Sequence, residues 1–225
     1  MRLIKDFLNG LSALFFPPIC KGCEQRMAVA QGVICADCWQ KLKLFPPEVL
    51  KTKIIPESLV AVWPVYLFDD LLQKIVHALK YQGNISLGHE LGERMGQNLP
   101  QEISGLRAAL LVPIPLHPIK LRERGYNQSE AIARGLGHTL EIPVEIGLLK
   151  RIKNTVTQTK LNAAERQANM QTAFTIKNNR SIDPECTVIL VDDVFTTGAT
   201  LGSAAAAFHQ VGMRRIMAVT AAAPI

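Results

Sequence analysis

One stretch near the C-terminus, residues 188–200, constrains the fold of this chain more than any other. It begins with four apolar residues, 188–191, as a buried parallel strand would. Two carboxylates, Asp192 and Asp193, follow where this strand is expected to end, and a Thr/Gly-rich loop then leads into an Ala-rich segment. A buried strand that passes through a short loop into a helix predicts an α/β fold.

The loop after this strand predicts a phosphate site. In an open α/β sheet, ligands bind beyond the carboxyl ends of the strands, and a helix N-terminus presents free N–H groups to an anion. The acidic pair would accept hydrogen bonds from two vicinal hydroxyls of a ribose, directly or through Mg²⁺ and its waters. A glycine allows close backbone approach, and threonine hydroxyls add donors. The expected phosphate-binding residues are Thr196, Thr197, Gly198, Ala199 and Thr200.

The rest of the chain predicts a mostly parallel sheet that is covered by helices on both faces. Strand-like segments are expected at 59–67, 108–114, 142–149, 187–192 and 214–220. Helical spacing is found at 69–81, 86–98, 127–140 and 198–210. Such alternation is typical of α/β domains. We expect one domain over 59–225, preceded by an N-terminal part, 1–58, that holds a cysteine module and a Pro-rich linker.

The cysteine module has metal-ligand spacing. Two Cys-x2-Cys pairs, separated by 11 residues, can place four thiolates tetrahedrally around Zn²⁺. An iron–sulfur cluster is the alternative, because it also takes four cysteines. No signal peptide is expected, so a reducing compartment favours metal over disulfides. The predicted ligands of this structural zinc are Cys20, Cys23, Cys35 and Cys38.

Charge and hydropathy bound the partners. The net charge of +6 and the pI near 9.2 permit a polyanionic partner, although the same charge also serves ordinary solubility. The basic excess lies in residues 1–58 and 113–170. No apolar run is long enough for a transmembrane segment. Residues 2–16 predict an amphipathic helix that docks on its own protein, with a membrane surface as the alternative.

The string 188–200 resembles the phosphoribosyl pyrophosphate (PRPP) motif of type I phosphoribosyltransferases. A wider resemblance, to the bacterial ComF/GntX family of ComFC-like competence proteins, spans nearly the whole chain. It rests on the double Cys-x2-Cys module, on residues 113–118 with 121–128, on Arg151 with Thr157, Gln158, Leu161, Arg166 and Asn169, and on 188–200. The resemblance implies a phosphoribosyltransferase-like core with an N-terminal zinc-ribbon-like module.

The resemblance also implies roles for individual residues. Asp192 and Asp193 would contact the ribose and Mg²⁺, while the Thr/Gly loop would hold the 5-phosphate. The segment after the strand at 108–114 would face the pyrophosphate, and the basic stretch 150–170 would form a mobile hood. Pyrophosphate or nucleic-acid contacts are therefore expected from Arg122, Arg124, Arg151 and Arg166. Ion pairs with neighbouring carboxylates, or a solvated loop, are the alternatives for these arginines.

Two functions stay open on the sequence. The first is a PRPP-binding protein that acts in DNA uptake during natural transformation and handles incoming single-stranded DNA. Its expected location is cytoplasmic, at the uptake machinery of the inner membrane, beside a competence helicase or another DNA-processing protein. The second is an active Mg²⁺-dependent phosphoribosyltransferase whose acceptor is not identified. Neither the oligomeric state nor a general acid or base follows from the residues.

Overall fold

The computed structural model describes residues 18–27, 32–106, 108–152, 173–177 and 182–225. The helix expected at 2–16 lies outside the described residues, as do Arg166 and most of the basic stretch 150–170. Within the described residues, no helix combines the length and the apolar character that crossing a membrane requires.

A four-stranded sheet forms the centre of the molecule, and all its neighbouring strands run parallel. Its order is β1-β6-β5-β2. The strands are β1 (Ala61–Leu67), β6 (Ile216–Ala223), β5 (Thr187–Val194) and β2 (Ala109–Pro113). The predicted α/β class with a parallel sheet is therefore confirmed. The carboxyl ends of β5 and its two neighbours meet at one edge, where parallel sheets place their ligands.

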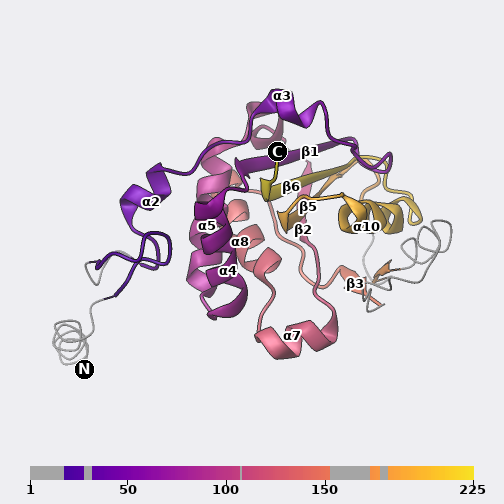
Figure 1. The fold of residues 1–225 in the computed structure, drawn as a ribbon. Helices are drawn as coiled ribbons and strands as arrows, with labels where there is room; N and C mark the ends of the chain where they lie inside the picture. Colours follow the sequence, from indigo (N-terminus) through magenta and orange to yellow (C-terminus); the bar gives the residue numbers. More distant parts are fainter. Residues whose placement is uncertain (1–17, 28–31, 107, 153–172, 178–181) are drawn as a thin grey trace, which may run out of the picture.

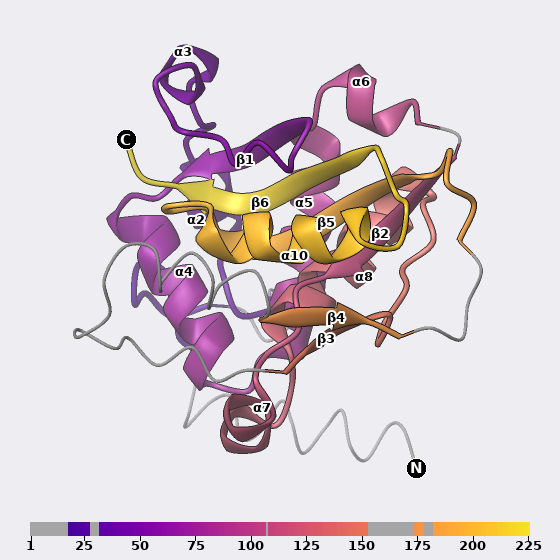
Figure 2. The same cartoon turned by 90° about the vertical axis from the view of Figure 1, so that its right-hand side faces the viewer.

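Helices cover both faces of this sheet (Figure 1; Figure 2). One face carries α4 (Asp70–Tyr81), α5 (Ile85–Asn98) and α8 (Gln128–Leu140). The other carries α10 (Ala199–His209). Within β5, Ile189 joins the core on the first face, whereas Val188 and Leu190 join the core on the second. Burial on both sides explains why this strand is a continuous apolar run instead of an alternating one.

Several short elements escaped the sequence analysis. They are α2 (Ala36–Gln40), α3 (Pro47–Leu50), α6 (Gln101–Ser104), α7 (Pro118–Arg124), and the antiparallel strands β3 (Leu149–Arg151) and β4 (Phe174–Ile176). Each has seven residues or fewer, so none repeats its apolar pattern long enough to reveal a period. Figure 2 shows the β3–β4 pair beside α10.

The strand predicted at 142–149 is wrong in extent. Only Val144 makes a parallel bridge, to Leu111 of β2, and the chain then leaves the sheet. Pro143 has no N–H to offer a ladder, and Gly147 turns the backbone with a φ of 77°. β3 begins only at Leu149, where it pairs with β4 instead of the central sheet.

The end of β5 also differs from the prediction. The strand was expected over 187–192, with the acids where it ends, but β5 continues through both acids to Val194. Asp192 remains paired with Thr220 of β6, and Val194 with Ala222. Since successive side chains of a strand point to opposite faces, this extension separates the directions of the two acids.

The N-terminal cysteine module packs on the main core. Cys20, Ile34 and Trp39 are buried in the same apolar cluster as Leu72 of α4. The ammonium of Lys74, also in α4, donates to the carbonyl of Gly22 at 3.4 Å. Whether 1–58 and 59–225 behave as separate domains stays a prediction, but their apolar interiors are continuous.

Two glycines allow α5 and α8 to cross at very short range. A Cβ atom at Gly92 of α5 would lie 2.1 Å from the carbonyl oxygen of Ile132. A Cβ atom at Gly135 of α8 would lie 2.0 Å from the carbonyl oxygen of His89. Both obstacles are backbone atoms, which a rotamer change cannot move. The crossing matters for function because α8 also supplies the side chains that hold the acidic pair.

We expect Gly92→Ala to destabilise the protein although alanine favours helices. The propensity gain of roughly 1 kcal/mol is smaller than the cost of forcing two helices apart, so the net loss should be about 2 kcal/mol. Thermal unfolding should show a midpoint lowered by about 4–8 °C. Ser86→Ala, at an exposed position of the same helix, is the control and should change it little. An unchanged midpoint for Gly92→Ala would contradict the tight crossing.

Candidate functional site

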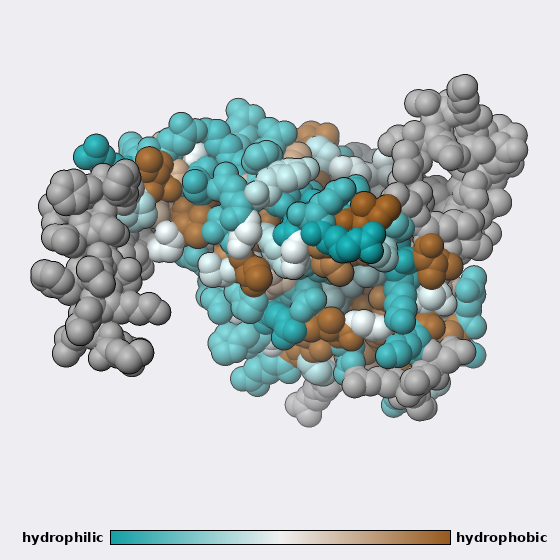
Figure 3. Space-filling model, turned by 90° about the horizontal axis from the view of Figure 1, so that it is seen from below, coloured by the Kyte–Doolittle hydropathy of each residue, from teal (hydrophilic) through white to brown (hydrophobic). Residues whose placement is uncertain are grey.

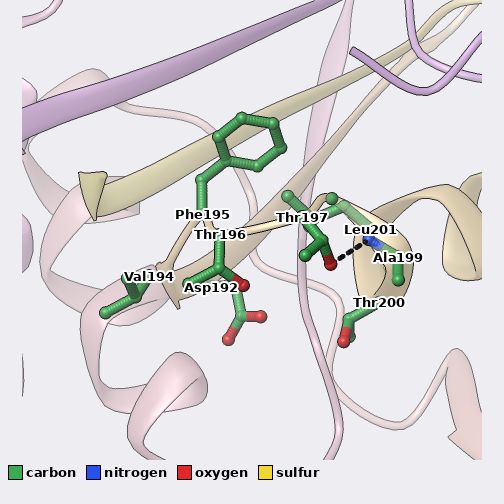
Figure 4. A pocket seen from close by; sticks show the side chains of 9 residues that line it. Asp192, Val194, Phe195, Thr196, Thr197, Ala199, Thr200 and Leu201 are labelled. Carbon is green, nitrogen blue, oxygen red and sulfur yellow. Dashed lines mark hydrogen bonds between the residues drawn. The ribbon is translucent and has the colours of Figure 1, made fainter. Parts of the chain in front are cut away.

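A small pocket opens at the carboxyl end of β5 (Figure 4). It has a volume of about 30 Å³ and is lined by Asp192 and by residues 194–201. This is far below the roughly 300–1,000 Å³ of a whole ligand pocket, so it suits one small group of a larger ligand. The pocket contains one of the two predicted acids and all five predicted loop residues, from Thr196 to Thr200.

Gly198 shapes the loop at the bottom of this pocket. Its φ of 74° is left-handed, and an added Cβ would lie 2.9 Å from the ring of Phe195 and from Pro56 of the linker. The next residue begins α10, and its N–H donates to the Thr197 hydroxyl at 3.4 Å (Figure 4). The first backbone N–H groups of α10 therefore lie at the pocket, where they can serve an anion.

Asp192 is held by hydrogen bonds from two directions. The Ser129 hydroxyl, at the start of α8, donates to its Oδ1 atom at 2.9 Å, and the Asp193 backbone N–H donates to the same atom at 2.9 Å. Burial, and then the negative charge of Asp193, raises the pKa of Asp192 to about 7 despite these bonds. The carboxylate would therefore gain from a cation or from hydroxyl donors at the pocket.

Asp193 faces a different set of partners. The Lys80 ammonium, in the last turn of α4, lies 2.5 Å from its Oδ2 atom, and the Gln128 side-chain amide donates to the same atom at 3.3 Å. The Arg124 guanidinium in turn donates to the side-chain oxygen (Oε1) of Gln128. The two acids are thus not equivalent: Asp192 lines the small pocket, whereas Asp193 is buried against a lysine and an amide.

Three of the four predicted arginines lie among the described residues, and the structure separates them. Arg124 lies beside the acidic pair through Gln128, whereas Arg122, on the same helix, is exposed and does not line the pocket that Arg124 lines. Arg151, at the end of β3, is partly buried with its guanidinium 5.4 Å from the centre of the Phe174 ring. Burial lowers the pKa of Arg151, while the negative charge of Asp192 opposes this shift. The structure therefore brings Arg124 and Arg151 toward the acids.

Three contacts of the acidic pair were missed by sequence reasoning: Lys80, Gln128 and Ser129. Gln128 and Ser129 directly follow Asn127, whose side chain caps α8 by accepting from the Ser129 N–H. Their signal in the sequence was their place, as polar residues, at the start of the predicted helix 127–140. The structure shows that this first turn is buried. Lys80 offered no signal, because a lysine in the last turn of a helix is common for electrostatic reasons alone.

His117 has a structural role. Its Nδ1 atom accepts a hydrogen bond from the Ile119 N–H at 3.3 Å and so caps α7. Helix α7 ends at Gly125, whose φ of 80° stops it. The segment after β2 therefore contains a helix with defined ends.

The four predicted cysteine ligands come together. Their sulfur atoms all lie within 4.8 Å of one another. The sulfur atoms of Cys20 and Cys38 are 3.7 Å apart, and those of Cys23 and Cys35 are 3.8 Å apart. Backbone N–H groups of Gly22 and Cys35 point at the Cys20 sulfur, at 3.4 and 3.3 Å. This four-sulfur cluster can hold a metal ion.

The electrostatics of the cluster favour a thiolate at Cys20, whereas burial raises the pKa of Cys38. Burial raises the pKa of Cys20, but backbone hydrogen bonds, from Cys35 first, outweigh it and lower the pKa to about 6. Thiolates are the form that binds metals. Trp39, which follows Cys38, is 5% exposed and has the Arg94 guanidinium 4.4 Å from its ring centre. It belongs to the core, so it is not available for base stacking.

The comparisons with known proteins agree with these features. No family model matches the chain. It is 25% identical over 221 residues to Competence protein F of Haemophilus influenzae. The alignment covers 90% of this chain and 95% of that protein. It is 27% identical over 199 residues to Competence protein ComFC of Bacillus subtilis, covering 86% and 79%. DNA utilization protein YhgH of Salmonella typhimurium is 25% identical over 209 residues, covering 85% and 91%.

The chain is similar over 85–90% of its length to these competence and DNA utilization proteins, which supports its assignment to the ComF family. The resemblance identified in the sequence is thereby confirmed, and its described parts meet in two places. The cysteine pairs form the four-sulfur cluster, whereas the segments around α7 and the end of β5 meet at the acidic pair. The chain thus has two separate clusters of functional side chains, the four-sulfur cluster and the acidic pair.

The raised pKa of Asp192 predicts a pH-dependent stability. Between the ordinary aspartate pKa near ~4 and the raised value of about 7, the folded chain holds a proton that the unfolded chain has lost. The free energy of unfolding should therefore fall as pH rises through this window. Asp192→Asn keeps an acceptor for Ser129 but removes the titration.

The measurement compares thermal unfolding of wild type and Asp192→Asn at about pH 5.5 and about pH 8. Relative to the variant, wild type should lose about 2 kcal/mol over this range, which is a shift of a few degrees in the midpoint difference. Titrations of groups that do not interact with Asp192 cancel in the comparison. A midpoint difference that does not change with pH would contradict the raised pKa.

Proposed function

We propose that this ComF-family protein binds PRPP with Mg²⁺ at the end of β5 and handles incoming single-stranded DNA during DNA uptake. One observation carries the PRPP part. A carboxylate with a raised pKa, Asp192, lines the same small pocket as the N-terminus of α10. A ribose 5-phosphate presents the matching groups, hydroxyl donors next to an anion.

The loop would hold the 5-phosphate. The backbone N–H groups at the start of α10 would donate to its oxygens, and the hydroxyls of Thr196, Thr197 and Thr200 line the same pocket. The 30 Å³ volume fits a site for one group, with the sugar and pyrophosphate extending outward. Binding would require the Thr197 hydroxyl to exchange its contact with the Ala199 N–H for a phosphate oxygen.

Asp192 would contact the ribose hydroxyls and Mg²⁺. The donor set suits a hard cation, because carboxylate oxygens are preferred ligands of Mg²⁺, which binds through one or two carboxylates and phosphate groups. The ion would supply positive charge to the pyrophosphate and to Asp192. Asp193 would act on the site indirectly, because Lys80 and Gln128 already contact its Oδ2 atom. Arg124 and Arg151 lie on the sides from which pyrophosphate oxygens could be bound.

The DNA part rests on the relatives and on charge. Two of the relatives are named competence proteins and one a DNA utilization protein, which favours DNA handling over base metabolism. The net charge of +6 suits a polyanion. We place this role where single-stranded DNA enters the cytoplasm, at the inner-membrane uptake machinery and beside a helicase or other DNA-processing protein.

The four-cysteine cluster would hold a structural zinc ion. All four positions of a tetrahedral site would be taken by sulfur, which leaves none for a substrate. The cluster packs directly on the main core through Cys20 and Cys38, so the ion would also stabilise the face that carries α4.

Purified protein should contain one zinc ion per chain, measured by atomic emission. Removing it with a strong chelator should lower the unfolding midpoint by about 10 °C or more, because metal-binding energy is folding energy. Cys38→Ser should lose the zinc, whereas Cys186→Ser, which lies outside the cluster, should keep it. Visible absorption with bound iron would instead indicate an iron–sulfur cluster.

Calorimetric titration of PRPP with Mg²⁺ tests the proposed ligand. Wild type should bind saturably and only weakly without Mg²⁺. Asp192→Ala should lower the affinity at least about tenfold, because one lost charged contact corresponds to about 1.5–3 kcal/mol. Glu185→Gln, which removes an exposed carboxylate elsewhere, should bind as wild type does.

The fold must be checked alongside this titration. The Asp192→Ala variant should retain its zinc and unfold cooperatively, so that a loss of binding is a property of the site. Absence of PRPP binding by zinc-loaded wild type would reject the ligand. The DNA-handling role would then depend on binding to single strands alone.

A further inference from the structure

A second pocket lies on the other side of the acidic pair, between the end of α4 and helix α7. Its volume is about 220 Å³, much larger than that of the phosphate pocket. Its lining residues are Lys80, Tyr81, Gly83, Lys120, Glu123 and Arg124. Lys80 connects the two places, because it lines this pocket while its ammonium pairs with Asp193.

Tyr81 presents an aromatic ring to solvent in this pocket. It is 68% exposed, although it closes a helix in which Leu72, Ile75, Val76 and Leu79 are buried. The His77 ring lies 4.8 Å from it, tilted by 43°, and the Arg124 guanidinium lies 5.6 Å from its centre. These neighbours hold the ring in place without covering it, which distinguishes it from a core residue that packing would bury.

The rest of the lining supplies charge. Lys120 and Arg124 add two cations on α7, and Glu123 adds one carboxylate. Since Lys80 is balanced by Asp193, the pocket keeps a net positive charge from α7. Figure 3 views the side of the molecule that carries α7, and strongly hydrophilic groups lie next to apolar ones there. An exposed aromatic ring between cations is suited to a planar, anionic ligand.

We propose that this pocket binds one nucleotide unit, with its base stacked on Tyr81 and its phosphate paired with Lys120 and Arg124. Every base has a π-face, so stacking on tyrosine requires no particular sequence, and arginine adds a cation–π contact. The unit is a residue of a single strand if the proposed DNA-handling function holds, on which this part of the inference rests. A free mononucleotide has the same chemistry.

The location gives the pocket a functional link. Arg124 contacts the nucleotide pocket and also donates to Gln128, which holds Asp193. A ligand that draws Arg124 or Lys80 toward itself would change the hydrogen bonds and charge around Asp193, next to the proposed PRPP site. Binding of a nucleotide unit and binding of PRPP should therefore be coupled, each changing the affinity for the other by the same factor.

Fluorescence anisotropy of a labelled oligothymidylate of about 16 nucleotides tests the stacking. Tyr81→Ala should weaken binding by about fivefold or more, and Tyr81→Phe, which keeps the ring, should bind as wild type does. Lys120→Ala should reduce the slope of log affinity against log salt by about 0.7, as expected for one lost phosphate contact to a single strand. Both residues are exposed, so neither change should alter the unfolding midpoint by more than a degree or so.

The matched control removes charge on the opposite edge of the sheet. Arg214→Ala with Arg215→Ala takes away two exposed cations just before β6, far along the strand from the acidic pair. This double variant should weaken binding less than Tyr81→Ala does at about 0.15 M salt, where distant charges are screened. A larger loss in the control would show that general charge, and not the pocket, binds the strand, and would overturn the proposal.

Competition with thymidine monophosphate separates the two sources of the nucleotide. If thymidine monophosphate displaces the oligonucleotide only at a far higher concentration, the ligand of the pocket is a single strand. If the two bind with equal potency per site, the ligand is a free mononucleotide. Either outcome supports the pocket. If wild type binds the strand and Tyr81→Ala binds equally well, the pocket is wrong while the proposed function stands. If wild type binds neither, both the pocket and the DNA-handling role fail, whatever the PRPP titration shows.

Discussion

The contact between the end of β5 and the start of α8 is the interaction on which the rest of the site depends. Extending β5 to Val194 places two adjacent carboxylates within the sheet, where burial and the charge of Asp193 raise the pKa of Asp192. The first turn of α8 offsets the loss of water contacts, since Ser129 donates to Asp192 and Gln128 donates to Asp193. Charge balance for Asp193 comes from Lys80, which the sheet could not supply.

This arrangement explains why α5 and α8 cross so closely. Helix α8 must lie close to the sheet for its first turn to reach β5. Gly135 of α8 allows α5 to pack directly against α8. Helix α4 lies on the same face and ends with Lys80 at the acids. The cysteine module packs on α4 through Lys74 and the core, so it supports the helix that carries Lys80.

On the opposite face of the sheet, α10 and the linker confine the loop 196–200. Helix α10 begins at Gly198, and Pro56 of the linker lies where a side chain at this position would be. The loop is therefore confined between the sheet, its own helix and the linker. Such confinement keeps backbone N–H groups oriented before a ligand arrives, which reduces the ordering cost of binding.

The sequence by itself determined the α/β class, the long helices, the four-cysteine cluster and the loop 196–200. These features rest on local patterns: apolar period, cysteine spacing, and a strand that leads through glycine into a helix. Only the tertiary structure decided that Asp192 and Asp193 face different partners, that Arg124 reaches the acids while Arg122 does not, and that Tyr81 stays exposed beside them. Lys80 and Asp193 are far apart in the chain, and no local pattern records a contact that exists only because two elements pack on one sheet.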